Sequence, residues 1–160
     1  MQNVTNSWLH DPIMTPSEVL VATHMPHGDI WKWCKIWFGG PAQPSGRQGA
    51  PNKYSPLDCL ALTLGRQLLG LGMVGANVKA AVKTFRKLMN SGRYRKADLK
   101  ISSEGVTIVE DGFVPIRTPE VQITIHLNDF VENEAGKSQY RAYRAGWEKR
   151  RSLSRGEARV

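Results

Sequence analysis

The sequence predicts an α+β fold, with helices in the first 92 residues, a small antiparallel β unit over 93–136 and a basic tail over 137–160. Up to residue 89, apolar residues recur every three or four positions behind Ser or Thr, as in capped amphipathic helices. From residue 97 the apolar period changes to two, which is typical of strands with one buried face. Between the helices, residues 39–53 hold four glycines and three prolines, a composition that predicts a loop.

Length and composition limit the class of protein. A chain of 160 residues is about one domain long, enough to bury a core without disulfide or metal staples. No apolar run approaches the ~20 residues of a membrane helix, and the N-terminal segment lacks the pattern of a secretory signal. We therefore expect a cytoplasmic protein without a membrane partner. Cys34 and Cys59 have no close metal-ligand spacing and lie on apolar helix faces, which predicts buried, reduced thiols.

Charge is divided unevenly along the chain, whose net charge is +8. Residues 1–92 hold nine Lys/Arg against four Asp/Glu (+5), residues 93–136 hold five against eight (−3), and residues 137–160 hold eight against two (+6). Segregated positive charge suggests a polyanionic partner, because each neutralised phosphate releases counterions. Taken alone, the charge is explained about equally well by solubility.

The first two helices form a predicted helix-turn-helix. Thr15, Pro16 and Glu18 make a capping box with proline at the first helical position, so a short helix begins here. The turn "MPHG" ends it, and Asp29 is predicted to cap the next helix.

The second helix contains "GDIWKWCKIWFGG", residues 28–40, which has an apolar and a basic side. At about 100° per residue, one face is predicted to pack in the core and the other to carry charge outward. The predicted core face consists of Ile30, Trp33, Cys34 and Trp37, and the outer face of Trp31, Lys32, Lys35 and Ile36.

Two longer helices follow the loop. Ser55 and Pro56 begin a helix whose apolar positions run from Leu57 to Leu68 and which Gly70 and Gly72 end. The fourth helix is predicted from about residue 75 to 89, with basic residues mostly on its polar side.

Alternating residues predict three strands after the helices. The segment 99–112 alternates on both sides of a "SSEG" turn and predicts a hairpin, and residues 121–127 predict a third strand with one buried face. A helical turn is expected at 129–135, and residues 137–160 are expected to form a weakly helical or disordered tail.

The order helix, turn, basic helix, Gly/Pro-rich loop, Lys53-Tyr54 and "SPLDCLALTLGRQLLGLGM" resembles the MerR-type winged helix-turn-helix over residues 14–89. Lys53-Tyr54 stands at the family's Arg-Tyr step, Asp58 at the acidic position of its third helix, and Leu68 with Gly72 at that helix's end. The resemblance implies a winged DNA-binding domain over 14–92. The alternating pattern and the charge predict a dimerisation or partner-binding β unit over 93–136 and a basic tail over 137–160. The family's long dimerisation helix is missing, so we expect the strands within 97–136 to form the dimer interface. The alternative is that they fold back over the fourth helix within one subunit.

The resemblance implies a sequence-specific regulator of transcription, of bacterial or phage type, that binds double-stranded DNA as a homodimer. Lys32 and Lys35 would face the major groove or its phosphates. Trp31 would stack on the DNA or, as we favour, cover the base of the wing. The DNA-binding residues implied are His27, Trp31, Lys32, Lys35, Arg47, Gln48, Lys53 and Tyr54.

Three other functions remain open. The first is an excisionase-like architectural protein that bends DNA, and the second is an RNA-associated or assembly protein that uses the basic tail. An enzyme is third, but no nucleophile motif is present, so we expect no catalysis and no catalytic residues. His24 and His27 flank a proline turn without a third ligand in view, so we expect turn or phosphate contacts and no metal site. No cofactor is predicted, and no small-molecule effector can be identified from the sequence.

Overall fold

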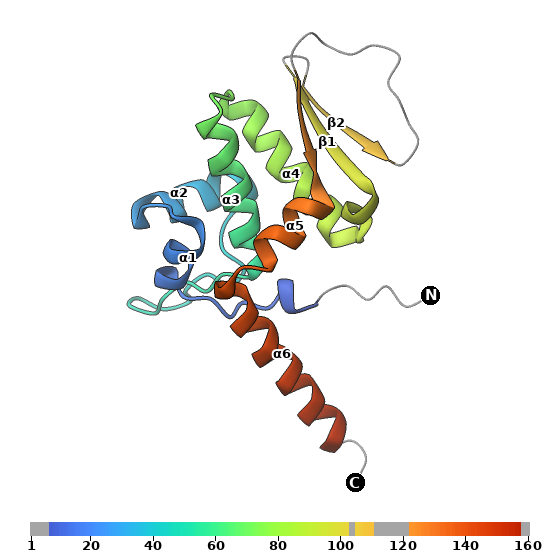
Figure 1. The fold of residues 1–160 in the computed structure, drawn as a ribbon. Helices are drawn as coiled ribbons and strands as arrows, with labels where there is room; N and C mark the ends of the chain where they lie inside the picture. The colour runs from blue at the N-terminus through green and yellow to red at the C-terminus, as the bar shows by residue number, and fades with distance from the viewer. Residues whose placement is uncertain (1–6, 103–104, 111–121, 158–160) are drawn as a thin grey trace.

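The computed structural model describes residues 7–102, 105–110 and 122–157 (Figure 1). The fold is α+β, as predicted, with a three-stranded antiparallel sheet beside the helices. The elements are η1 (Ser7–Leu9), α1 (Pro16–Thr23), α2 (His27–Phe38), α3 (Pro56–Gly70), α4 (Gly75–Ser91), η2 (Arg93–Lys96), β1 (Ala97–Ser102), β2 (Gly105–Glu110), β3 (Gln122–His126), α5 (Leu127–Ala135) and α6 (Ser138–Glu157).

Capping boxes start α1, where one was predicted, and α3, where the sequence predicted only the helix start at Ser55 and Pro56. The Thr15 N–H donates to Glu18 Oε2 at 2.7 Å, and the Glu18 N–H donates back to Thr15 Oγ1 at 3.4 Å. Ser55 and Asp58 make the same reciprocal pair at the start of α3. Each box satisfies two backbone N–H groups that the first turn leaves without partners.

The predicted cap of α2 is wrong. Pro26 occupies the N-cap position, and Asp29 lies inside the first turn with its N–H donating to the Pro26 carbonyl at 2.9 Å. Proline is compatible with this position because the first N–H groups of a helix have no helical acceptor, and the Asp29 carboxylate still faces the positive end of the helix dipole. At the other end, Gly39 adopts a φ of 88° and terminates α2, a conformation that favours glycine.

One short backbone pairing joins the segment before α1 to the residue after the loop, and a second joins the two ends of the loop. Met14 pairs with Tyr54, and Gln43 pairs with Lys53. Residues 14, 43 and 53–54 thereby place the segment before α1 and both ends of the loop side by side. His24 ends α1 with a φ of 55°, so its predicted role as a turn residue is confirmed.

The sheet packs against α4. Its strand order is β2-β1-β3, with Leu99 opposite Ile108 on one side and Ile125 on the other. Leu99 and Ile101 of β1 are buried, and both β1 and β2 contact α4. The strands therefore fold back over the fourth helix within one chain, which was the alternative to the expected dimer interface. Whether the segment also dimerises stays a prediction.

The expectation of a weakly helical or disordered tail is wrong, because residues 138–157 form α6, which projects from the body in Figure 1. Tyr140 is fully buried, while Tyr143 and Trp147 are partly buried and pack against the core. These three aromatic residues at positions i, i+3 and i+7 share one helix face.

Tyr143 also connects α6 to Glu18 of α1. Burial alone would raise the pKa of the Glu18 carboxyl, but hydrogen bonds from Thr15 and Tyr143 lower it. Tertiary contacts thus stabilise a helix whose composition alone is too polar to predict it. Immediately before it, the turn expected at 129–135 is the longer helix α5.

One cluster of buried apolar residues extends through all three segments of the chain. It runs from Trp8 and Leu9 in η1, an element that the sequence pattern does not predict, through α1 to α4 and β1 to Tyr140 in α6. Cys34 and Cys59 are buried and free, as predicted. In the part of the chain that the structure describes, no helix is both long enough and apolar enough to span a bilayer.

Candidate nucleic-acid interface

The outer face of α2 combines exposed aromatic and basic side chains. Trp31 is 45% exposed, and Lys32 and Lys35 are exposed beside it. On the opposite face Ile30, Cys34 and Trp37 are buried, as the helical period predicts, whereas Trp33 is only partly buried. The prediction of a two-sided helix is confirmed, with Trp33 at the boundary between the sides.

Each lysine of this face lies over a tryptophan ring. The Lys35 ammonium is 4.9 Å from the centroid of Trp31, and the Lys32 ammonium is 4.8 Å from that of Trp33. Such contacts contribute about 0.5–1 kcal/mol at exposed sites. They reduce the number of rotamers that the lysines occupy while leaving both charges in water, where a phosphate can approach.

Trp37 fixes the position of α2 on α3. Its ring stacks on Trp33 with centroids 4.8 Å apart and planes 22° apart. The six-membered edge of the ring lies against Gly65 of α3, where a Cβ would be 2.3 Å from Cζ3. Only a residue without a side chain allows the two helices this spacing, so Gly65 determines how far the basic face stands from the core.

Short-range hydrogen bonds order the loop at 39–53. Gln43 and Lys53 exchange two backbone hydrogen bonds of 2.9 and 2.8 Å, and the Ser45 N–H donates to Asn52 Oδ1 at 2.8 Å. Near the tip, the Ala50 N–H donates to the Arg47 carbonyl at 3.1 Å. The loop is thereby closed between residues 43 and 53, and residues 39–57 contain no Asp or Glu.

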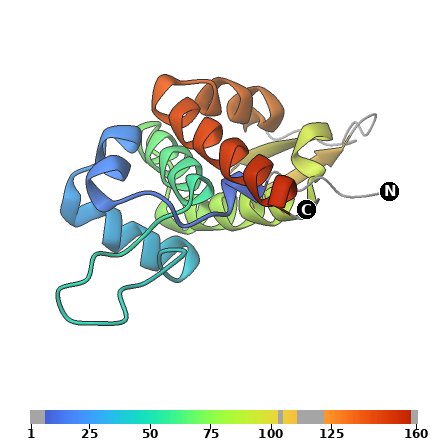
Figure 2. The ribbon, with the colours of Figure 1, turned by 90° about the horizontal axis from the view of Figure 1, so that it is seen from below.

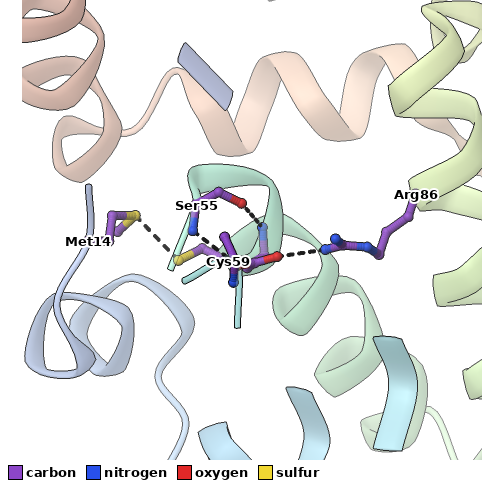
Figure 3. Close-up of polar contacts among 6 residues, drawn as sticks. Met14, Ser55, Cys59 and Arg86 are labelled. Carbon is purple, nitrogen blue, oxygen red and sulfur yellow. Dashed lines mark hydrogen bonds and ion pairs between the residues drawn. The ribbon is translucent and has the colours of Figure 1, made fainter. Parts of the chain in front are cut away.

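A buried carboxylate connects this loop to three helices. Asp58, fully buried in α3, accepts hydrogen bonds from the Ser55 N–H at 3.0 Å and from the Ala42 N–H in the loop at 2.9 Å. Its other oxygen pairs with Arg86 Nη1 of α4 at 2.7 Å, a contact visible in Figure 3. The Arg86 guanidinium also lies 4.2 Å from the ring centroid of Phe38, the last residue of α2. Sequence reasoning identified Asp58 but missed Arg86, because a pair separated by 28 residues leaves no local pattern.

The position of Tyr54 contradicts one of the predicted DNA contacts. Its side chain is 2% exposed and belongs to the core, so its predicted role in binding DNA is wrong. Burial raises the pKa of the Tyr54 phenol to about 12. Next to it along the pairing, Met14 Sδ lies 3.4 Å from Cys59 Sγ (Figure 3). The pairing of residues 14 and 54 turns the tyrosine inward, and the neighbouring Lys53 remains exposed.

The other predicted residues all reach the surface. His27 is the first residue of α2, Trp31 and the two lysines lie on its outer face, and the remaining three belong to the loop. These exposed residues are His27, Trp31, Lys32, Lys35, Arg47, Gln48 and Lys53. Whether they contact DNA stays a prediction.

The chain was compared with known proteins. No protein-family model matches it, and no curated protein matches it. Its proposed function therefore depends on the residues and geometry described above.

Proposed function

We propose that the chain is a sequence-specific regulator of transcription, of bacterial or phage type, that binds double-stranded DNA. In this proposal α2 enters the major groove and the loop 39–53 contacts the neighbouring backbone as a wing. The observation that carries the proposal is the outer face of α2, where Lys32 and Lys35 lie over tryptophan rings and remain exposed. An α-helix fits the major groove of B-form DNA, and lysines there reach bases or phosphates.

The charges of this surface are available to a partner. Among the ion pairs of the described residues, none includes Lys32, Lys35, Arg47 or Lys53. A phosphate can therefore replace water and counterions at these groups without breaking an existing ion pair, and the released counterions favour binding. The loop also holds its basic residues in place, because its hydrogen bonds are already formed in the free chain.

The proposal includes a dimer. A single helix and wing read few bases, so specific sites usually need two copies spaced by a turn of DNA. The strand order leaves β2 and β3 at the two edges of the sheet, and an edge strand can pair with the same strand of a second copy. Sedimentation of the full chain at micromolar concentration measures this directly, and a monomer with and without DNA would exclude the dimer.

Selection from randomised duplex DNA at a stated salt concentration tests the proposed function. A palindromic consensus supports a dimeric regulator, and a single half-site supports the excisionase-like alternative, in which the protein bends DNA. If no sequence is enriched and duplex DNA is not retained, the proposal is wrong and an RNA-associated or assembly role gains support.

A pair of double variants tests the surface itself. Lys32→Gln with Lys35→Gln removes two charges and is expected to reduce the slope of log affinity against log salt by about two units, at ~0.9 per phosphate. Lys32→Arg with Lys35→Arg keeps the charges and should keep the slope. If the glutamine variant binds with the wild-type affinity and slope, α2 does not face DNA.

A further inference from the structure

Helix α4 carries a row of lysines that the proposed function does not use. Lys79, Lys83 and Lys87 are spaced by four residues, and all three are exposed on the side of α4 opposite its buried residues. The row is about 12 Å long at 1.5 Å per residue. One strand of DNA carries roughly three to four phosphates over that length, at ~3.4 Å each.

No acidic side chain of the described residues neutralises this row. Residues 75–91 contain no Asp or Glu, and among the ion pairs in the described ranges none includes Lys79, Lys83 or Lys87. Like charges four residues apart on one helix face repel one another and destabilise the helix. The row thus costs stability in the free protein, and an external polyanion would remove that cost.

A contact between α4 and α2 connects the side of α4 next to the row with the basic face of α2. Arg86 is about 60° around α4 from Lys83, and its guanidinium covers Phe38 of α2 at 4.2 Å. On α2, Phe38 shares one flank with Trp31 and Lys35, since these residues are separated by seven and three positions. The contact between Arg86 and Phe38 therefore joins the flank of α2 that holds Lys35 to the flank of the lysine row.

The basic helix α6 faces elsewhere. In Figure 2 the loop 39–53 extends from one side of the helical body, and α5 and α6 cover the other side. The main contacts of α6 are with α5 and η1, and Tyr143 adds a hydrogen bond to Glu18 of α1, whereas α4 contacts α2. A DNA duplex bound to α2 and the loop would thus lie closer to the lysine row than to α6.

We propose that Lys79, Lys83 and Lys87 form a second row of phosphate contacts that extends the DNA footprint from α2 along α4. The inference rests on the proposed function and adds to it a surface that reads no bases. Phosphate contacts increase affinity for every duplex and fix the orientation of the protein, while base contacts determine sequence preference. The row therefore raises specific and non-specific affinity by the same factor.

The test compares two triple variants of the full chain that change charge equally. Lys79→Gln, Lys83→Gln and Lys87→Gln remove the row. The control, with Lys149→Gln, Arg150→Gln and Arg151→Gln, removes three exposed charges from α6. Binding is measured against salt concentration on the selected duplex and on a scrambled duplex of the same length.

The α4 variant is expected to lose roughly two to three units of salt slope, at ~0.9 per phosphate, and to lose the same factor of affinity on both duplexes. The α6 variant should retain the wild-type slope. Circular dichroism should show both variants folded, with the melting temperature of the α4 variant unchanged or higher because like charges have been removed.

Two results would overturn the inference while leaving the proposed function in place. One is a wild-type slope in the α4 variant of a chain that does bind duplex DNA. The other is an equal loss in both triple variants, which would indicate net charge and no local contact. Failure of the wild-type chain to bind any duplex would overturn the proposed function and this inference together.

Discussion

Replacing Gly65 by alanine tests how α2 is held. The new Cβ would lie 2.3 Å from Cζ3, 2.4 Å from Cη2 and 2.8 Å from Cε3 of Trp37, where carbon atoms normally stay about 3.5–4.0 Å apart. Trp37 is 2% exposed and stacked on Trp33, so its ring has no free direction in which to move. Either α2 moves away from α3 or the ring leaves its rotamer.

Overpacking of this kind costs about 1–3 kcal/mol, and three close contacts with a rigid ring place Gly65→Ala at the upper end. Alanine recovers about 1 kcal/mol of helix propensity, which leaves a net loss of about 2 kcal/mol. For a chain of this size each kcal/mol corresponds to roughly 2–4 °C. We therefore expect the melting temperature to fall by about 4–8 °C.

Gly70→Ala is the matched control. Gly70 is the last residue of the same helix, and nothing lies within 4 Å of the position that a Cβ would take there. Its melting temperature, measured like that of Gly65→Ala by circular dichroism, should stay unchanged or rise slightly. The environment of Trp37, followed by tryptophan fluorescence, should change only in the Gly65 variant. A Gly65→Ala protein that melts with the wild type would refute the argument that Gly65 sets the spacing of α2 and α3.

Three further measurements follow from the same packing. In urea denaturation Trp37→Ala should lose about 3–5 kcal/mol, and Trp33→Ala should lose less because that ring is only partly buried. Burial raises the pKa of the Tyr54 phenol to about 12, against about 10 in an unfolded chain. The stability that comes from keeping this phenol protonated in the folded state is therefore complete below pH 10 and is lost as the pH rises towards 12. Stability should fall less steeply above pH 10 in Tyr54→Phe, and equal slopes would contradict this assignment. Burial also raises the pKa of the thiols of Cys34 and Cys59, so neither should react with a disulfide reagent faster than the chain unfolds, and a rapid reaction in the native protein would contradict their burial.

The sequence determined those features that depend on neighbouring residues. The capping boxes at Thr15 and Ser55 connect residues three positions apart, so helix starts could be predicted and were confirmed. The two faces of α2 and the alternation of β1 follow from the helical and extended periods, which are also local. For the same reason the exposure of Lys32 and Lys35 in the candidate site was predicted correctly.

Tertiary structure alone decided the features that need a distant partner. Lys53 and Tyr54 stand at the end of a Gly/Pro-rich loop, where the sequence predicts that both are exposed. Pairing of residues 14 and 54 nevertheless places the tyrosine side chain in the core. The ion pair of Asp58 with Arg86 depends on α3 and α4 lying side by side, and no pattern within either helix indicates it.

Residues 138–157 illustrate the physical reason. Their composition is too polar to stabilise an isolated helix, and the free energy that orders them comes from docking Tyr140 and its aromatic neighbours on a core built by other segments. Local sequence sets which backbone conformations are accessible at low cost, through caps, periodicity and glycine. Which face finally becomes buried depends on surfaces that meet only after the chain has folded. Those surfaces determined the inward position of Tyr54, the helix α6 and the contact of Arg86 in α4 with Phe38 in α2.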